Sequence, residues 1–189
     1  MADEPQIVLV RHGETEWSSS GKHTSYSDIP LTDRGREQAA ALAPRLLGRG
    51  FVLVLTSTRE RSMDTCAFAG LGDRAEISDD LDEWNYGEYE GRTTADIRKE
   101  VPDWTIFTHG VPGGETDEQV AARADLVLAR AADAGGHTAL FSHGHFLRVL
   151  GARWLGLECN EGRLLGLDVA TISILGHERT QRVLRVWNS

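Results

Sequence analysis

The sequence has few cysteines, a deficit of positive charge and no long apolar stretch. Two cysteines in 189 residues cannot form a disulfide framework, so we expect both to be reduced thiols in a cytoplasm. No run approaches the roughly 20 apolar residues of a membrane-spanning helix, and the acidic, polar start is unlike a signal peptide. The 20 Lys and Arg against 29 Asp and Glu give a net charge of −9. Nucleic acids and anionic membranes attract basic surfaces, so we expect neither as the main partner.

The composition is otherwise that of an ordinary globular protein, with 40% hydrophobic and 26% charged residues. The length suits one domain, which we expect to cover residues 1–189. Three short apolar runs, at 7–10, 51–55 and 137–142, predict strands that are buried on both faces. A hairpin is expected near the end of the chain, with strands 169–175 and 181–187 and a turn at 176–178.

Segments with apolar residues at helical spacing lie between the predicted strands. Helices are expected after Thr32, after Arg59, between Thr116 and Gly135 in a segment that opens with a capping box, and over 146–155. Pro44 should kink the first helix, and residues 13–31 and 71–114 should be mostly irregular, with one short helix near 94–101. Alternating strands and helices predict an α/β fold: a three-layer α/β/α sandwich around a mostly parallel sheet.

Basic residues follow each predicted parallel strand. Arg11 and His12 end the first, Arg61 follows the second and His143 follows the third. Ligands bind beyond the carboxyl ends of such strands, so these side chains should converge there. Guanidinium forks suit phosphate oxygens, and a histidine can act as base, acid or nucleophile. Any one of these residues alone would more simply be structural, but the convergence favours a site for a phosphoryl group.

Arg11-His12-Gly13-Glu14-Thr15 resembles the RHG signature of the histidine phosphatase superfamily, the phosphoglycerate-mutase-like family. Further matches follow in order over residues 7–149. They are Leu31-Thr32-x-x-Gly35-x-x-Gln38-Ala39, Ser57-x-x-x-Arg61-Ser62-x-x-Thr65, Leu81-x-Glu83-Trp84-x-Tyr86-Gly87-x-Tyr89-Glu90-Gly91, Gly114-Glu115-Thr116 and Ser142-His143-Gly144-His145. The resemblance implies a phosphoglycerate-mutase-like sandwich.

The resemblance also implies a mechanism without metal or cofactor. His12 would attack phosphorus and become phosphohistidine, while Arg11, Arg61, His143 and the backbone N–H of Gly144 would bind the phosphate oxygens. Glu83 would protonate the leaving group and then activate water. The alternative acids are Glu88 and Glu90, and nearby Asp79, Asp80 and Asp82 would form a charged rim.

Residues of the predicted rim match positions at which family members hold the substrate. These are Thr15, Ser18, Thr24, Ser25 and Tyr86, although turn hydrogen bonds or core packing explain them equally well. Zinc held by His143 and His145 is a weaker alternative, because both arginines would repel a metal. The remaining histidines are most simply loop or surface residues. The five tryptophans are most simply residues that pack in the core.

Three features favour a phosphatase over a mutase. Ser18 replaces an asparagine typical of phosphoglycerate mutases, segment 92–114 lacks their paired arginines, and no covering tail follows the last strand. The string 83–91 is most similar to the small phosphatases and the sugar-bisphosphatase-like members. We therefore expect hydrolysis of phosphate monoesters of small metabolites, with sugar phosphates suggested by analogy, and a pocket that also binds inorganic phosphate or sulfate.

Other functions stay open on the sequence. They are a phosphoglycerate mutase, a phosphoprotein phosphatase and a binding module for phosphohistidine, although the intact set of catalytic residues argues against the last. A dinucleotide-binding protein is set aside because no G-x-G-x-x-G follows the first strand. The sequence does not distinguish a monomer from a homodimer.

Overall fold

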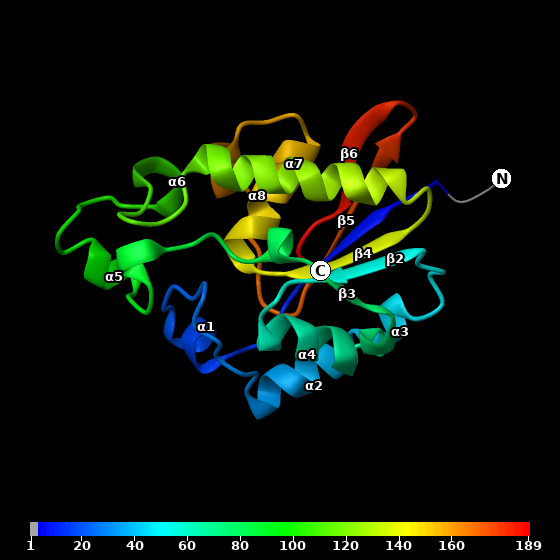
Figure 1. Cartoon of the computed structure of the whole chain (residues 1–189), viewed down its shortest axis with the longest axis horizontal. Helices are drawn as coiled ribbons and strands as arrows, with labels where there is room; N and C mark the ends of the chain where they lie inside the picture. Colours follow the sequence, from blue (N-terminus) through cyan, green and yellow to red (C-terminus); the bar gives the residue numbers. More distant parts are fainter. Residues whose placement is uncertain (1–3) are drawn as a thin grey trace.

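The computed structural model describes residues 4–189, which are built around one sheet (Figure 1). Met1 to Asp3, part of the acidic start, lie outside the described residues. The strands of these residues are β1 (Ile7–Arg11), β2 (Leu53–Thr56), β3 (Glu76–Ile77), β4 (Thr138–Ser142), β5 (Ile172–Glu178) and β6 (Gln181–Val186). Their order is β3-β2-β4-β1-β5-β6. The first four are parallel, while β5 and β6 are antiparallel, which confirms the mostly parallel sheet.

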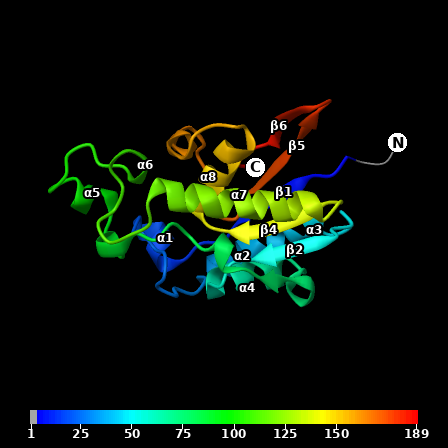
Figure 2. The ribbon, with the colours of Figure 1, turned by 45° about the horizontal axis from the view of Figure 1, so that its top comes forward.

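Helices cover both faces of the sheet, which confirms the three-layer sandwich (Figures 1 and 2). One face carries α2 (Asp33–Ala41), α3 (Ala43–Leu46) and α4 (Glu60–Phe68), and the other carries α7 (Asp117–Asp133) and α8 (Gly144–Trp154). Successive residues of β1 point to opposite faces. Val8 and Val10 join the core under α2 to α4, and Ile7 and Leu9 join the core under α7 and α8.

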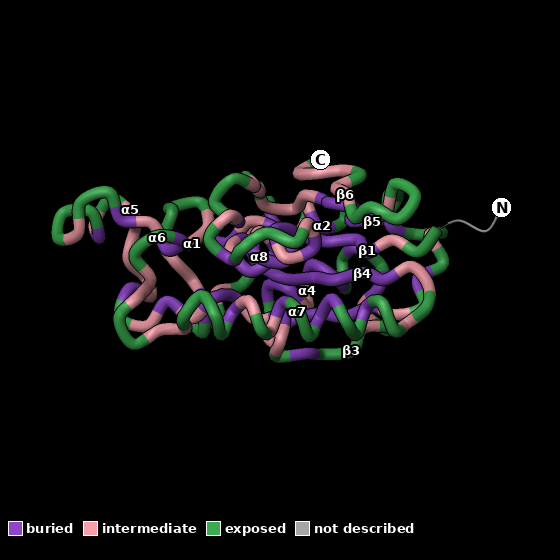
Figure 3. Tube along the Cα trace, turned by 90° about the horizontal axis from the view of Figure 1, so that it is seen from above, coloured by how far each residue is buried: buried purple, intermediate pink, exposed green. Residues whose placement is uncertain are grey.

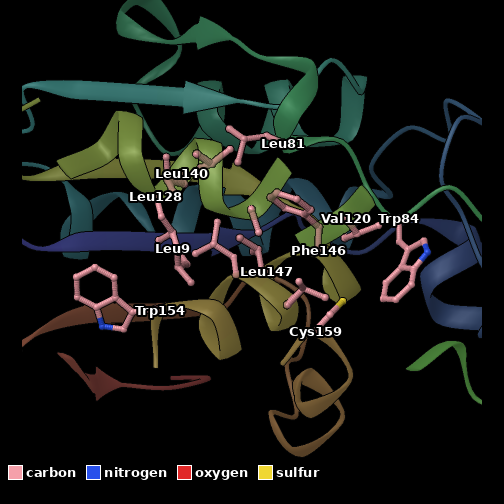
Figure 4. Close-up of a cluster of buried hydrophobic side chains, with 14 of the residues drawn as sticks. Leu9, Leu81, Trp84, Val120, Leu128, Leu140, Phe146, Leu147, Trp154 and Cys159 are labelled. Atoms are coloured by element: carbon pink, nitrogen blue, oxygen red, sulfur yellow. The ribbon is translucent and has the colours of Figure 1, made fainter. Parts of the chain in front are cut away.

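The core between the sheet and α7 and α8 is drawn in Figure 4. Leu9 and Leu140 from the sheet face Leu128 of α7 and Leu147 of α8, and all four are buried. Each such side chain stabilises the fold by about 1.5–3 kcal/mol relative to an exposed one. The central strands are mostly buried, and exposed residues lie in loops and on the outer sides of helices such as α7 (Figure 3).

Local differences from the sequence predictions have identifiable causes. Residues 13–31 contain a helix, α1 (Glu16–Ser20), because Thr15 and Ser18 form a capping box at its start. Pro44 does not kink one helix but lies in the first turn of a second, α3, where its missing N–H costs nothing. The predicted helix near 94–101 is shorter, with α5 covering Thr94–Ile97, and α6 (Ile106–His109) was not predicted.

The predicted hairpin is present, but its predicted turn is wrong. β5 continues through Gly176 to Glu178, which pairs with Gln181, so the turn is Arg179-Thr180. Arg179 in this turn adopts a left-handed φ of 57°. Gly176 instead lies in the strand against the side chain of Arg185.

The sheet brings the carboxyl ends of β1, β2 and β4 to one edge, as parallel pairing requires. The helices α1, α5 and α6 lie beyond this edge, at the left of Figure 1. Loops after the three strands therefore meet under a cover made of segments 16–28 and 92–114. Within residues 4–189, no helix has the length and apolar character needed to cross a membrane.

Candidate active site

His12 lies directly beyond β1, with its ring almost fully buried. Its backbone N–H donates to the Ser142 carbonyl of neighbouring β4 at 3.0 Å. Its Nδ1 lies 2.7 Å from the Gly13 carbonyl oxygen. A carbonyl can only accept, so Nδ1 carries the proton and Nε2 has a bare lone pair. Within residues 4–189, no hydrogen-bond partner of this Nε2 atom is present.

The glycine of the first motif and the glycine of the second are in backbone contact. A Cβ on Gly13 would lie 2.4 Å from the Gly35 carbonyl oxygen, and one on Gly35 would lie 2.1 Å from the Glu14 carbonyl oxygen. Gln38 accepts a hydrogen bond from the Glu14 N–H, and Thr32 caps α2 through the Gly35 N–H. The second motif thus fixes the loop that carries His12 against α2.

Arg61 and His143 form a buried pair behind His12. Both are fully buried, and the Arg61 Nε–H donates to His143 Nδ1 at 3.2 Å. Because Nδ1 accepts, Nε2 of His143 carries the proton and donates to Ser57 Oγ at 2.7 Å. The rings of His12 and His143 have centroids 5.2 Å apart. Both ring nitrogens of His143 are therefore bonded to protein, and its binding of a phosphate oxygen stays a prediction.

The Arg61 guanidinium also holds the cover of the site. It donates to the carbonyl oxygens of Thr24, Ser25 and Ser27. That loop is held from its other side by Glu90, whose carboxylate accepts from the Ser25 and Ser27 N–H groups and from the Ser25 hydroxyl. The carboxylate of Glu90, one of the alternative acids, is thus engaged by the loop.

Arg11 reaches from the end of β1 towards the start of α8. Its Nη1 donates to the Leu167 carbonyl. Its Nε is buried and has no hydrogen-bond partner among residues 4–189. An unsatisfied buried donor costs about 1–3 kcal/mol, which an anionic oxygen at this position would offset. A Cβ on Gly144 would come within 3.2 Å of this guanidinium, so the glycine makes room for Arg11.

Glu83 is held by the N-terminus of α8. Its carboxylate accepts from the backbone N–H groups of His145 at 3.0 Å and Phe146 at 2.8 Å, and from its own neighbour Trp84 at 2.9 Å. The N–H groups of His145 and Phe146 belong to the first turn of α8, so they have no partner inside the helix. The Tyr86 hydroxyl contacts both this carboxylate and, at 2.5 Å, His145 Nδ1. Glu83 is therefore fixed in position, whereas Glu88 is exposed.

A cavity of about 170 Å³ joins several of these groups. Of the predicted residues, it is lined by Arg11, His12, Ser18, Thr24, Glu83, Tyr86 and Gly144. Arg61 and His143 lie behind it. Two predicted rim residues also lie outside its lining: Thr15 is buried and caps α1, and Ser25 donates to Glu90.

The same cavity is lined by residues that the sequence analysis did not assign to it: Gly21, Lys22, His23, His145, Arg148 and Leu167. His145 and Arg148 lie on the first turns of α8, two and five residues after His143, so helical spacing could have suggested them. His23 was expected to be a loop or surface residue; it lies in a loop, where it is half-buried against Tyr86 and Trp104. Nothing in its local sequence indicates that burial.

The electrostatics keep the histidines of the site neutral. Burial, followed by the charges of Arg61 and Arg11, holds the pKa of His12 well below its ordinary value near 6.5. Burial likewise lowers the pKa of His143 and His145 well below that value, and that of His23 to about 4. At neutral pH the bare Nε2 of His12 is therefore available as a nucleophile, while Arg11 and Arg61 stay charged. In residues 4–189, no three His, Cys, Asp or Glu side chains gather in a way that could hold a metal ion.

Comparisons with known proteins agree with this geometry. The acid phosphatase of Mycobacterium tuberculosis is 44% identical over 186 residues, covering 96% of this chain and 91% of the relative. The sedoheptulose 1,7-bisphosphatase of Saccharomyces cerevisiae is 33% identical, covering 81% of this chain and 68% of the relative. A solved structure of the open reading frame Rv3214 product of M. tuberculosis superposes with a TM-score of 0.92 at 41% identity, covering 98% of each chain.

A probable phosphoglycerate mutase of Salmonella is also related, at 29% identity over 192 residues, 96% of this chain and 89% of that protein. The model of the histidine phosphatase superfamily, branch 1, matches residues 7–189. That match includes β1 with His12, the Glu83 segment and the start of α8, and it confirms the resemblance drawn from the motifs. The chain belongs to the histidine phosphatase superfamily.

Proposed function

We propose that this protein is a phosphatase that hydrolyses phosphate monoesters of small metabolites through a phosphohistidine at His12. The observation that carries the proposal is the state of the His12 ring. Its Nδ1–H is held by the Gly13 carbonyl, its Nε2 has no protein partner within residues 4–189, and it lines a cavity together with Arg11 and Glu83. A neutral, oriented imidazole beside a buried cation is what nucleophilic attack on a phosphate monoester requires.

In the first step, His12 Nε2 attacks phosphorus, an N–P bond forms and the P–O bond to the leaving group breaks. The carboxylic acid form of Glu83 gives its proton to the leaving oxygen, which departs as an alcohol. Arg11, with its unpartnered buried Nε, binds the phosphate oxygens as charge spreads over them. The role of Arg61 is to carry positive charge behind the oxygens, and the role of neutral His143, whose Nδ1 accepts from Arg61, is to orient that guanidinium.

In the second step, the Glu83 carboxylate takes a proton from water, and the water oxygen attacks phosphorus. The N–P bond breaks, phosphate leaves, and the lone pair returns to His12 Nε2. Glu83 is then protonated again, ready for the next ester. The three backbone N–H groups and Tyr86 hold this carboxylate in one place for both steps.

Two observations support a phosphatase over a mutase. Relatives at 44% and 33% identity are named as phosphatases, while the relative named as a probable mutase is 29% identical. The cover made by segment 92–114 contains only two short helices, α5 and α6, and no pair of adjacent arginines. A mutase must keep water from phosphohistidine, which a more extensive cover would do.

The test measures phosphate release, with EDTA present, from a panel of phosphorylated metabolites that includes 3-phosphoglycerate. Reactions with 3-phosphoglycerate are also analysed for 2-phosphoglycerate. We expect release from monoesters without isomerisation, and a labelled protein after alkaline quenching of a reaction with 32P-substrate. Isomerisation without release would establish a mutase instead, and neither product would favour the binding module.

We further propose that inorganic phosphate binds the same cavity and inhibits competitively, since Arg11 offers an unpartnered buried donor. A cytoplasmic location is proposed from the cysteines. Cys66 and Cys159 are buried thiols, and burial raises the pKa of each to about 12, which suits a reducing compartment. Inhibition kinetics and cell fractionation test these two points.

A further inference from the structure

The segment that carries Glu83 has no regular structure of its own. It covers residues 82–86, between two 3₁₀ helices. Backbone groups in such a segment have no partner in a helix or a strand ladder, so other elements must bond to them. The buried side chains of Leu81 and Trp84 anchor the segment in the core (Figure 4). The position of its backbone is set by hydrogen bonds from outside.

Arg123, on the second turn of α7, supplies several of these bonds. Its Nη1 donates to the carbonyl oxygens of Asp80 at 2.8 Å and Asp82 at 2.9 Å, and its Nη2 donates to that of Glu83 at 3.5 Å. Its guanidinium lies over the Phe146 ring, 4.7 Å from the centroid. The Phe146 N–H is one of the donors to the Glu83 carboxylate. Arg123 therefore contacts both the backbone that carries this carboxylate and the helix that binds it.

Glu115 fixes the direction of that guanidinium. Its two carboxylate oxygens accept from Nε and Nη2 of Arg123, both at 2.8 Å, and a two-point pair of this kind has a defined geometry. Glu115 also bonds to the segment itself: its carboxylate accepts from the Asn85 N–H at 2.9 Å, and its backbone carbonyl accepts from Trp84 Nε1 at 2.9 Å. Arg123 and Glu115, which we call the clamp, thus hold the segment on both sides of Glu83.

The clamp acts on Glu83 and not on the other groups of the candidate active site. Within residues 4–189, no hydrogen bond joins the clamp to His12, Arg11 or Arg61. Loss of the clamp should therefore displace the acid and leave the nucleophile and the phosphate-binding cations in place. A displacement of about 1 Å in a catalytic group can cost on the order of 10²-fold in rate.

We propose that Arg123 and Glu115 are positioning residues for the proton transfer at Glu83. They hold the backbone of Glu83 so that its carboxylate meets the start of α8 and lines the cavity of His12. The inference rests on the proposed function. It adds that the acid step depends on α7, whose residues lie outside the lining of that cavity.

The test compares two leaving groups in the wild type and in Arg123→Gln. The measured quantity is kcat/KM, which covers the steps up to phosphohistidine, in which Glu83 gives its proton. For the best alkyl phosphate of the metabolite panel, we expect Arg123→Gln to lower kcat/KM by about ten- to a hundredfold. For p-nitrophenyl phosphate, whose leaving group hardly needs a proton, we expect less than about threefold. Equal factors for the two substrates, or no loss on either, would overturn the proposal.

A double-mutant cycle shows whether Arg123 acts through Glu83. In the Glu83→Gln background, Arg123→Gln should lower kcat/KM for the alkyl phosphate by less than about twofold, because the proton transfer that the clamp serves is already lost. A role in the general stability of the fold would give the same factor in both backgrounds, and that result would overturn the proposal.

Two milder variants test the geometry of the clamp. Glu115→Gln keeps one oxygen acceptor but loses the charged pair, so it should show the same leaving-group pattern with a loss of about three- to tenfold. Arg123→Lys keeps the charge, but a single ammonium cannot hold a carboxylate and three carbonyls at once, so most of the loss should remain. Full activity in Arg123→Lys would overturn the clamp. If Arg123→Gln is unfolded at the assay temperature, Glu115→Gln decides the test.

Arg153→Gln is the matched control. Arg153 forms a similar two-point pair between α8 and α7, with Asp125 at 3.0 and 2.9 Å, and it also donates to the Leu157 carbonyl. Its loss should change kcat/KM for either substrate by less than about twofold. A leaving-group pattern in Arg153→Gln like that of Arg123→Gln would show an effect of helix packing in general and would overturn the clamp.

The outcomes also separate the clamp from the phosphatase proposal. No phosphate release from any ester by the wild type would overturn the phosphatase. Equal losses on both leaving groups in Glu83→Gln would remove the acid role on which the clamp rests. A leaving-group pattern in Glu83→Gln that is absent from Arg123→Gln and Glu115→Gln would overturn the clamp alone.

Discussion

The cavity of His12 and a second cavity of about 230 Å³, which Arg98, Arg148 and Arg163 line, differ in how their side chains are held. Around His12, the functional groups are buried, and each is fixed by at least one hydrogen bond, as Glu83 is by three backbone N–H groups. In the second cavity, Arg98 and Arg163 are exposed; Arg98 directly follows α5, and Arg163 lies in the 3₁₀ helix Cys159–Leu164. The arrangement around His12 suits chemistry, which needs fixed geometry, whereas exposed side chains hold a geometry less well.

A second contrast is that between Glu83, which lines the cavity of His12, and Glu90, which does not. Both carboxylates accept backbone hydrogen bonds, but from different partners. Glu83 is held by the start of α8 and lines the cavity, whereas Glu90 holds the loop that receives Arg61. The same residue type thus lines the cavity in one place and positions a loop in the other.

The largest effect is expected from His12→Ala. Without the nucleophile, turnover should fall at least about a thousandfold, because His143, whose ring lies 5.2 Å away, has both ring nitrogens bonded to protein. Phosphate release measures the loss, and a thermal unfolding transition checks that the variant is folded. Activity near that of the wild type in a folded variant would exclude a covalent phosphohistidine mechanism.

Glu83→Gln and Glu90→Gln should separate the two carboxylates. Glu83→Gln should slow alkyl phosphates by about 10²–10⁴-fold, but p-nitrophenyl phosphate far less, since that leaving group hardly needs a proton. Glu90→Gln should slow both substrates by a similar factor, because it loosens the loop bonded to Arg61. Equal losses on both substrates in Glu83→Gln would remove its acid role.

Gly35→Ala tests how rigidly the His12 loop is held. The new Cβ would lie 2.1 Å from the Glu14 carbonyl oxygen, so backbone must move, at a cost of about 3 kcal/mol in the free energy of unfolding. Gly166→Ala is the matched control: its Cβ meets open space, and we expect a change within about 0.5 kcal/mol. Urea denaturation of both measures the difference. Similar changes in the two variants would contradict the close backbone contact.

The smallest effect is expected from His23, which lies between the two cavities. Its pKa is about 4 in the folded protein and near 6.5 when unfolded, so the unfolded state binds the extra proton between these values. Its contribution to stability is present above pH 6.5 and is lost as the pH falls from 6.5 towards 4. His23→Gln should lessen this decline, by at most about 1.4 kcal/mol per pH unit. Urea midpoints between pH 4 and 7 measure it; an unchanged slope would contradict the depressed pKa.

Much of the cavity of His12 could be predicted because its residues follow the ends of strands. Apolar runs fix β1 and β4, parallel pairing brings their carboxyl ends together, and His12 and His143 are thereby placed side by side. The glycine of the second motif was recognised by resemblance, and its reason, backbone contact with Glu14, is visible only in three dimensions.

The second cavity could not be predicted in this way. Arg98, Arg148 and Arg163 are separated by up to 65 positions (163 − 98) and share no motif or period. Their convergence depends on how α5, α6 and the 3₁₀ helix 159–164 pack over the start of α8. The predicted turn of the hairpin was wrong for a similar reason. The pairing of β5 with β6 extends β5 through Gly176 to Glu178. Such packing depends on contacts between distant segments, which local propensity does not encode.

The sequence by itself determined the α/β sandwich, the edge at which the strands end and the residues placed there, because hydrophobic period and parallel pairing are local patterns with one geometric outcome. Only the tertiary structure decided which side chains face the cavity, which proton each ring carries and which carboxylate serves the loop. Those properties depend on burial and on partners supplied by other elements: Gly13 for His12, Ser57 and Arg61 for His143, and the start of α8 for Glu83.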